Sequence, residues 1–431
     1  MPISYARARE LAQRLRRGQS VDQLSHRLKP VTESERALSP RVPGQGDWSE
    51  AARAERLAFL AAKGLDVSAL AGRAAAPDPA SLQGNIESYI GMTCIPTGLV
   101  GPLRINGLHA SGDYYVPLAT SEGALVASYD RGARLISLAG GASTITTTEQ
   151  VQRAPGFIFE SVAQAALFAV WAVAEFDRFR EVAATRTRHG QLVDLMTHIE
   201  ANHVYLIFAF YTGDAAGQNM VTFCTAAICA DILERSPIAP TSWFLESNMS
   251  GDKKATALSF FQTRGRNAIA EVLIDRTLFE KRMHTTPERM AEYWRMSFIG
   301  GVQTGSIGVS GHISNGIAAL FLATGQDAAC ISEASVGITR MEVAEGGGLY
   351  AAVTLPNLIV GTVGGGTSLP TQKACLDILG LAGPGHARAF AEMTAALLVA
   401  GELSIVGALT AGHFTRAHQR LARGSASRPE A

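Results

Sequence analysis

The chain has 431 residues, 47% of them hydrophobic and 18% charged, which is the composition of a globular protein long enough for two or three domains. Its 38 basic and 38 acidic side chains give a formal net charge of zero, so bulk charge attracts neither nucleic acid nor an anionic membrane surface. The five cysteines are odd in number and include no C-x-x-C pair, which indicates a reducing compartment without a disulfide framework or zinc site.

The first 84 residues predict a helical region. The sequence to about residue 80 is rich in Arg, Ala, Glu and Leu and predicts two or three surface helices, with breaks near 40–46 and 77–79. The arginines near the N-terminus have no apolar segment behind them, so a secretory signal is not expected. From Asn85 to residue 107 Gly and Pro are frequent, which predicts loop and short strand.

A strand followed by a helix is predicted around Glu122. Residues 114–119 (YYVPLA) have the pattern of a strand, and small and apolar residues recur at helical spacing over 124–139. The dipole at the start of a helix favours the anionic form of a glutamate. To act as a general acid, Glu122 would need its pKa raised by burial or by a second carboxylate.

Residues 154–244 alternate strand and helix patterns and predict a compact α+β unit inserted into a larger one. Near its end, 213–220 (GDAAGQNM) form a glycine-containing turn that opens a helix, where backbone N–H groups can approach a phosphate. A plain capped turn is the alternative on local grounds. The spacing is not G-x-G-x-x-G, so an ordinary Rossmann fold is not supported.

The sequence from about residue 243 onward is rich in Gly and Ala and predicts mainly helices. Lys253 and Lys254 lie at a predicted helix start, where the dipole disfavours cations, and adjacent cations suit an anion or oxyanion. Asp327 is an ordinary helix-start residue and also a candidate second carboxylate for Glu122. The glycine cluster at 361–367 (GTVGGGT) predicts either a flexible turn or space for a ligand.

Two apolar runs, at 305–324 and 393–412, are long enough to tempt a membrane assignment. The first contains His312 and Asn315 and the second contains Glu402, and polar groups at such positions are costly in a bilayer. Both runs therefore predict buried helices, and a cytoplasmic protein without membrane contact is expected. His413 and His418 are about 140° apart on a helix, so they do not form a metal pair and no metal site is expected.

These motifs together resemble the 3-hydroxy-3-methylglutaryl-CoA (HMG-CoA) reductase family. The family signatures are similar to ESYIGMTCIPTGLVGPL, PLATSEGALVAS, GDAAGQNM, DKK, GQDAA, GTVGGGT and GHFTRAH in this chain. They occur in order from about Glu87 to Gln419, roughly three quarters of the sequence. The DKK loop and the late histidine segment resemble the class I type, in its soluble prokaryotic form.

The resemblance implies an α+β fold with three parts. These are an N-terminal helical region (1–84), a helix-rich large substrate- and CoA-binding domain (85–153 and 245–431), and an inserted small ferredoxin-like NADP-binding domain (154–244). It also implies reduction of HMG-CoA to mevalonate and CoA with two NADPH, in a homodimer or higher oligomer whose active sites lie between subunits. NADPH and HMG-CoA are the expected partners.

The resemblance also implies roles for individual residues. The catalytic set comprises Glu122 as acid, Lys253 at the oxyanion, Asp327 as the group that couples their protonation, and His418 as the acid for the CoA thiolate. Substrate contacts are implied for Arg153, Lys254, Asn315 and, at a CoA phosphate, Arg131. Cofactor contacts are implied for Thr187, Arg188, Asp214, Gly217, Asn219, Met220, Gly364 and Gly365, with Thr187 and Arg188 near the 2′-phosphate.

Two departures from the family pattern lie where substrate should bind. Asp130 replaces an asparagine and adds an anion beside Arg131, and Met296, next to Arg295, falls where a lysine is expected. Two alternatives follow: a related reductase acting on another branched acyl-thioester, or a family-like binding subunit without activity. The catalytic residues disfavour the second alternative.

Overall fold

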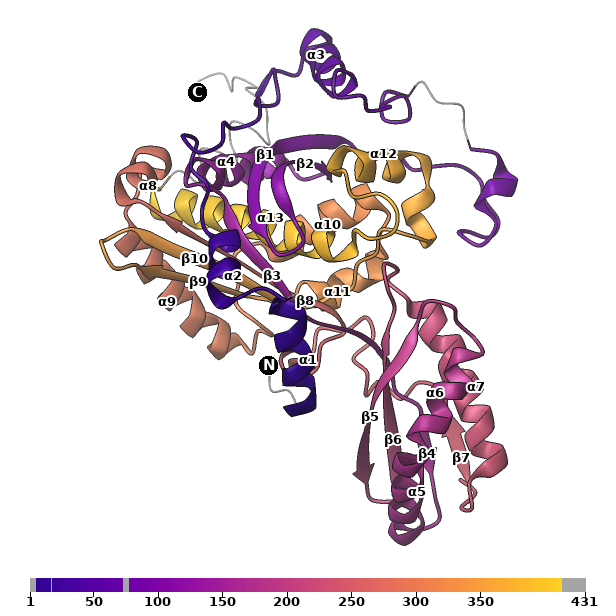
Figure 1. The fold of residues 1–431 in the computed structure, drawn as a ribbon. Coiled ribbons are helices and arrows are strands. Elements are labelled where there is room, and N and C mark those ends of the chain that lie inside the picture. The colour runs from indigo at the N-terminus through magenta and orange to yellow at the C-terminus, as the bar shows by residue number, and fades with distance from the viewer. Residues whose placement is uncertain (1–4, 17, 73–76, 413–431) are drawn as a thin grey trace, which may run out of the picture.

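The computed structural model describes residues 5–16, 18–72 and 77–412, and it is a mixed α/β structure built on an antiparallel sheet (Figure 1). Three helices precede the sheet: α1 (Tyr5–Arg16), α2 (Val21–Leu28) and α3 (Glu50–Ala61). Serine side chains cap α2 and α3, as is favourable at a helix start. The prediction of two or three surface helices in this part of the chain is confirmed, while its extent to residue 84 as a region of its own stays a prediction.

In the described part of the chain, ten strands form one sheet, with the order β7-β4-β6-β3-β8-β10-β9 along its main path. β1 pairs with β2 and β3, and β5 pairs with β6. The strands are β1 (Thr97–Gly107), β2 (Ser111–Ala119), β3 (Ala142–Arg153), β4 (Gly156–Ile158), β5 (Gln191–Glu200), β6 (His203–Tyr211), β7 (Ser242–Phe244), β8 (Gly265–Ile274), β9 (Ile338–Val343) and β10 (Leu349–Leu358). β3 belongs to both halves of the sheet, because its first part pairs with β8 and its last three residues pair with β6.

The helices after α3 divide between the two halves of the sheet. They are α4 (Leu125–Leu138), α5 (Val162–Ala174), α6 (Phe176–Ala184), α7 (Gln218–Arg235), α8 (Arg276–Met283), α9 (Pro287–Thr304), α10 (Ile313–Thr324), α11 (Ile331–Ala334), α12 (Pro370–Leu379) and α13 (Ala387–Thr410). The predicted strand and helix around Glu122 are β2 and α4, so both elements are confirmed. Glu122 itself lies in the turn between them, before the N-cap Ala124, and not at the start of the helix as predicted.

Helix α13 is the centre of the larger hydrophobic core, where it packs against α4, β3, β8 and β10. Its 24 residues are long and apolar enough to cross a membrane, but 89% of the relevant window is buried inside the protein. Small residues allow the close approach of α4, since a Cβ at Gly132 would overlap the Ala400 backbone. The prediction of a buried helix is confirmed here and for α10, which covers 313–324 of the first apolar run, but it is wrong for 305–312, which form no helix. The cytoplasmic location stays a prediction.

The prediction of mainly helices after residue 243 is wrong for three segments, β8, β9 and β10. β10 lies between β8 and β9 and is buried along most of its length, so it lacks the alternation of a half-exposed strand. Its Gly- and Ala-rich surroundings therefore carried no strand signal. Lys253 also lies in a turn, and the next element is the short 3₁₀ helix Ala257–Phe260 instead of an α-helix.

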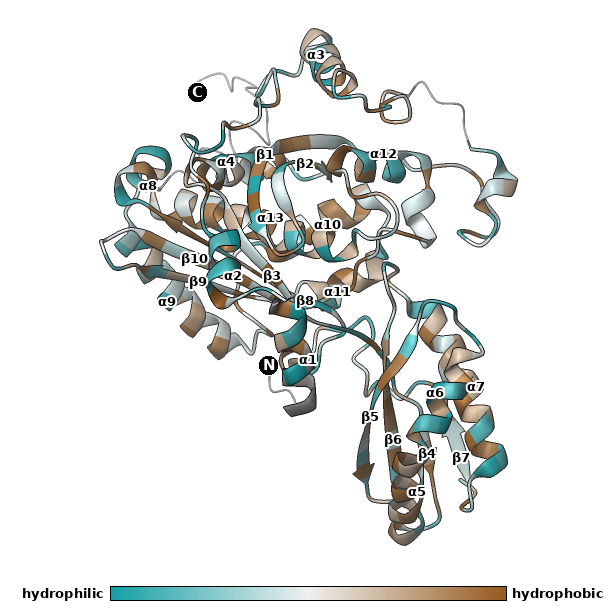
Figure 2. Cartoon of the chain, viewed as in Figure 1, coloured by the Kyte–Doolittle hydropathy of each residue, from teal (hydrophilic) through white to brown (hydrophobic). Residues whose placement is uncertain are grey.

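The inserted block contains β4, α5, α6, β5, β6, α7 and β7 in chain order, and in Figure 1 it projects from the rest of the molecule. Its strands lie in the antiparallel order β5-β6-β4-β7. The helices pack on one face of these strands around an aromatic core that includes Phe157, Phe168 and Phe208. Figure 2 shows that α5 is hydrophobic along most of its length. The boundaries of this block as a domain stay a prediction.

Candidate active site

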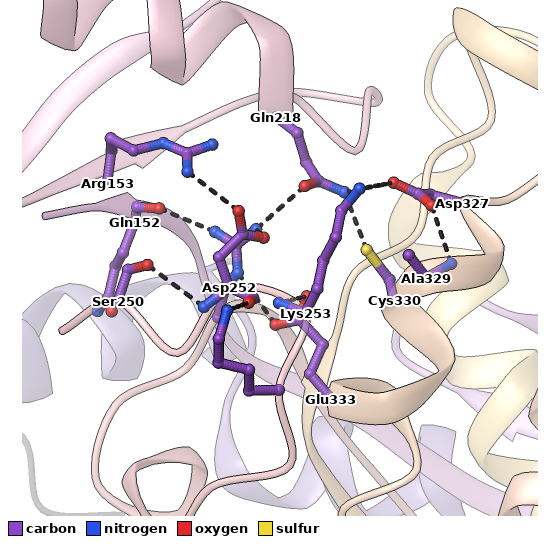
Figure 3. A network of polar contacts seen from close by, with 12 residues as sticks. Gln152, Arg153, Gln218, Ser250, Asp252, Lys253, Asp327, Ala329, Cys330 and Glu333 are labelled. Carbon is purple, nitrogen blue, oxygen red and sulfur yellow. Dashed lines mark hydrogen bonds and ion pairs between the residues drawn. The ribbon is translucent and has the colours of Figure 1, made fainter. Parts of the chain in front are cut away.

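Lys253 and Asp327 form an ion pair, with Nζ 2.8 Å from Oδ2 (Figure 3). Their side chains are 41% and 36% exposed, so solvent and a substrate can reach the pair. The hydrogen bond from Lys253 to Asp327 raises the pKa of the lysine. Partial burial acts to raise the pKa of Asp327, but the contacts from Lys253 and from the Ala329 N–H lower it overall. The pair therefore presents a stable ammonium beside a carboxylate at the protein surface.

The turn that carries Lys253 is held by buried charges. Lys253 has a positive φ of 56°, which is uncommon for a residue with a side chain, and its N–H donates to Glu333 at 3.1 Å. The neighbouring carboxylate of Asp252 accepts from Arg153 at 3.0 Å and from Arg264. Glu333 and Arg264 also pair with each other, with both side chains buried. This network fixes the backbone that aims the Lys253 side chain.

Glu122 takes part in a different contact. It lies at the surface after β2, and its Oε2 accepts from Asn315 Nδ2 at 2.7 Å. Asn315 is in the first turn of α10, and the residues just before α10 are fixed by the buried Glu402, which accepts from the N–H groups of Gly311 and His312 at 2.7 Å. Glu122 and Asn315 are thus brought together as a second polar pair.

The two pairs lie at opposite ends of α10. Asn315 is in its first turn, and Asp327 follows its C-cap, Gly325, by two residues. A helix of 12 residues is about 18 Å long. Within one chain, therefore, the structure does not bring Asp327 to Glu122. Among the described residues of this chain, Asp327 does not serve as the second carboxylate beside Glu122.

The two glycine segments lie side by side, although about 150 residues separate them in sequence. The N–H of Thr362 donates to the carbonyl of Asp214 at 2.9 Å, and a Cβ at Gly361 would lie 2.6 Å from the backbone nitrogen of Ala216. Gly364 and Gly365 have positive φ values and open space where a Cβ would be. Such a double turn of exposed backbone, ending at the first residues of α7, can accommodate a phosphate-containing ligand.

The third predicted cofactor segment meets α7 as well. A Cβ at Gly190 would lie 2.6 Å from Met220 Sδ and 3.1 Å from Thr187 Oγ1, so this loop packs directly on the first turn of α7. Arg188 and Asn219 are both exposed near this contact. Gly217 has a φ of 79° and immediately precedes α7. The structure therefore gathers the predicted cofactor residues around one helix start.

Several predicted ligand-binding side chains already have partners in the chain. Asp214 accepts from the N–H groups of Gly385 and Ala387, so it caps α13. Lys254 donates to the carbonyl of Asp252 at 2.8 Å. These contacts show structural roles that the sequence did not predict.

The two predicted substrate arginines are similarly engaged. Arg153 pairs with Glu246 and Asp252. Arg131 donates to the Ser404 side chain at 2.9 Å and to its carbonyl. Both guanidinium groups are thus held in place by the chain itself, before any ligand binds.

A groove between the N-terminal segment, β1, α4 and α12 has a mainly apolar lining that also includes six arginines. These are Arg41, Arg53, Arg56, Arg131, Arg134 and Arg282. Partial burial is the largest cause that lowers the pKa of Arg134, and the charges of Arg41 and Arg282 lower it further. Asp130 binds Arg41, Gln45 and the Gly101 N–H, so the anion expected to weaken a phosphate contact is already engaged by a guanidinium group.

The sequence assigned no role to Gln218, Asp252, Arg264 and Glu333. Asp252 and Gln218 lie inside the quoted DKK and GDAAGQNM segments, but their roles depend on contacts with residues elsewhere in the chain. His413 and His418 lie outside the described residues. Within the part of the chain that the structure describes, no group of three or more His, Cys, Asp or Glu side chains could hold a metal ion.

Comparison with known proteins gives a consistent result. The family model for hydroxymethylglutaryl-coenzyme A reductase matches residues 52–423. Proteins named 3-hydroxy-3-methylglutaryl-coenzyme A reductase are 44% identical in Pyrococcus abyssi, over 80% of this chain and 86% of that protein, and 40% identical in Haloferax volcanii, over 89% and 95%.

A solved class II 3-hydroxy-3-methylglutaryl-CoA reductase from Streptococcus pneumoniae, bound to NADPH in open conformations, has a similar fold. The TM-score is 0.68, over 83% of this chain and 96% of that chain, at 22% sequence identity.

Proposed function

The chain belongs to the hydroxymethylglutaryl-coenzyme A reductase family, and we propose that it reduces (S)-HMG-CoA to (R)-mevalonate and CoA with two NADPH. The product belongs to the mevalonate pathway of isoprenoid synthesis. The observation that carries the proposal is the Lys253–Asp327 pair, which lies beside the turn that opens α7. Reduction of a thioester carbonyl needs a cation beside the carbonyl oxygen and a hydride donor facing the carbonyl carbon. Lys253 would supply the cation, and the turn would hold the coenzyme that carries the hydride.

The role of Lys253 follows from charge. When bound, NADPH supplies a hydride to the carbonyl carbon, and negative charge then develops on the carbonyl oxygen. The ammonium of Lys253 is fixed by its ion pair and by the turn that holds its backbone, so it can stabilise this oxygen without rearrangement. Asp327 keeps Lys253 protonated, and the apparent pKa values belong to the pair.

We propose that Glu122 reaches this site from a second subunit. Glu122 and Asn315 lie at the other end of α10 from Asp327, so one chain alone separates the acid from the oxyanion group. The surface also carries apolar groups that a second copy can cover: Ile86, Ile90 and Met92 before β1, and Met296, Ile299 and Val302 on α9. A homodimer or higher oligomer would place Glu122 of one subunit opposite Lys253 of the other.

The departure of the CoA thiolate needs a proton to prevent its return to the carbonyl, and His418 is proposed as the donor. Its segment follows α13. The remaining roles stay as the resemblance implies them: Arg153, Lys254 and Asn315 at the substrate acid, and Arg131 with its neighbouring arginines at the CoA phosphates. The groove supports the last of these roles, since Arg41, Arg134 and Arg282 all line it and a group of guanidinium charges attracts polyanions.

The coenzyme is proposed to bind around the first turn of α7, in the ferredoxin-like unit of residues 154–244. The turn of residues 213–220 contacts Gly361 and Thr362 at the start of the glycine segment 361–367, and the loop that contains Thr187 contacts Met220 in the first turn of α7. The exposed guanidinium of Arg188 suits a 2′-phosphate, which only NADPH carries. The class I assignment stays a prediction that rests on the DKK and late histidine motifs.

The test uses purified protein, HMG-CoA and NADPH, with NADPH absorbance and free thiol measured together. Two NADPH consumed per CoA released supports the proposal. Oxidation of NADPH only with other branched acyl-CoA thioesters would replace HMG-CoA as the substrate, and absence of turnover with any thioester would leave a binding subunit. No substitution is needed to decide between these three outcomes.

A further inference from the structure

Gln218 connects the coenzyme turn to the catalytic pair. It is the first residue of α7, directly after Gly217. Its Nε2 lies 3.2 Å from Asp327 Oδ2 and 2.9 Å from the sulfur of Cys330, and its Oε1 accepts from Arg264 at 3.2 Å (Figure 3). One amide side chain therefore touches the Lys253–Asp327 pair and the charge network beneath it.

The orientation of this amide is fixed by its partners. A guanidinium group only donates hydrogen bonds, so the Gln218 oxygen must face Arg264. The NH₂ group must then face Asp327, whose carboxylate accepts. The same Asp327 oxygen receives Lys253 Nζ at 2.8 Å, so Gln218 and Lys253 are two donors to one acceptor. A protonated Asp327 would have less capacity to accept both.

We infer that Gln218 is a positioning residue that holds the Asp327 carboxylate against Lys253 and so ties the geometry of the coenzyme turn to the oxyanion group. This inference rests on the proposed function. Gln218 occupies the second variable position of the family motif D-A-x-G-x-N-M, so the motif itself does not require an amide there. A change at this position alters the proton affinity of the catalytic pair without removing a catalytic group.

The position of Gln218 in the turn explains why it can act in this way. The left-handed φ of Gly217 and its close contact with Thr212 fix the direction in which α7 begins. On the other side, Gln326, next to Asp327, exchanges hydrogen bonds of 2.8 and 2.9 Å with the backbone of Gly361 in the second glycine segment. Asp327 and Gln218 are therefore each anchored to one of the two turns proposed to hold the coenzyme phosphates.

Two substitutions test the inference through the pH profile of kcat at saturating HMG-CoA and NADPH. Gln218→Met removes the donor to Asp327 at similar length, so the pKa of Asp327 rises and the acid limb should move to higher pH by about 0.5–1 unit. Gln218→Glu keeps an acceptor for Arg264 but places a second carboxylate beside Asp327. The acid limb of this variant should therefore move to higher pH by more than about 1 unit. Gln164→Met makes the same chemical change at the start of α5, where Gln164 contacts Glu160 and Ser161, and should leave the profile unchanged.

Affinity for NADPH, measured by direct titration without substrate, separates positioning from folding. Gln218→Met should bind NADPH as the wild type does, because the backbone of the turn is kept and no charge is added. Gln218→Glu is not used in this comparison, because its added carboxylate lies beside the turn proposed to hold the coenzyme phosphates. A lower kcat in Gln218→Met without a shift of the acid limb of the pH profile would overturn the inference. Acid limbs at the same pH in Gln218→Met, Gln218→Glu and Gln164→Met would also overturn it.

Wild-type turnover with HMG-CoA tests the proposed function independently of Gln218. If the wild type does not turn over HMG-CoA, the inference is still decided by ¹³C NMR titration of aspartate carboxyl groups, with Asp327→Asn to assign the resonance. An Asp327 titration that moves upward in Gln218→Met supports the inference, and one that does not move overturns it.

Discussion

Subunit complementation is the sharpest consequence of the division of the site along α10. Glu122→Ala and Lys253→Ala should each abolish turnover, because one removes the acid and the other the oxyanion cation. Within a chain the two groups lie at opposite ends of a helix about 18 Å long, too far apart for one carbonyl oxygen to contact both. If each site combines Glu122 of one subunit with Lys253 of its partner, a mixed dimer of the two variants contains one intact site and one doubly altered site.

The expected recovery follows from symmetry. Random mixing of two variants gives about half mixed dimers in a C₂ assembly, and half of their sites are intact, so activity should return to about one quarter of the wild-type value. The assay is NADPH oxidation with HMG-CoA after the mixed subunits are dissociated and reassembled. Glu122→Ala mixed with Asn315→Ala is the matched control, since both changes affect the same half-site and no intact site can form. No recovery in the first mixture, with reassembly shown by tagged subunits, would refute the placement of the two halves in different subunits.

Four further predictions concern single positions. Lys253→Ala should lower kcat by about a thousandfold or more. It should change the free energy of unfolding by less than about 1 kcal/mol, because the ion pair with Asp327 is partly exposed. The control Lys373→Ala removes a comparable ion pair, with Asp377, and should leave turnover unchanged. Arg188→Ala should raise the KM for NADPH about tenfold and leave the KM for NADH unchanged, since only NADPH carries the 2′-phosphate. Arg134→Ala should weaken HMG-CoA about tenfold in low salt but not a pantetheine thioester without phosphates. Burial raises the pKa of Glu392 from 4.5 to about 7. The stability of the wild type relative to Glu392→Gln should therefore be greatest below about pH 4.5 and fall by roughly 3 kcal/mol as the pH rises to 7. Urea unfolding of both proteins across this pH range measures the difference.

The sequence predicted the elements whose patterns are local. The strand and helix around Glu122, the helices near the N-terminus and the burial of α13 all followed from spacing and composition, and the structure confirms them. The strands β8–β10 were missed, because a strand buried between two others shows no alternation and small residues do not separate strand from helix. Lys253 was assigned to a helix start, but charges distant in sequence, among them Glu333, hold it in a left-handed turn.

The candidate site residues likewise divide into those that a motif identifies and those whose role depends on contacts in the fold. Motifs identified Glu122, Lys253 and Asp327, because each lies in a recognisable segment, but no motif indicates which of them share a site within one chain. That information comes from α10, which places Asn315 beside Glu122 at one end and presents Asp327 to Lys253 at the other. Gln218 illustrates the reverse case, because its position in the motif is variable and its chemistry is unremarkable until Arg264 and Asp327 orient its amide. A chain that kept every motif residue but replaced Gln218 would retain the family pattern and still differ in the proton affinity of its catalytic pair.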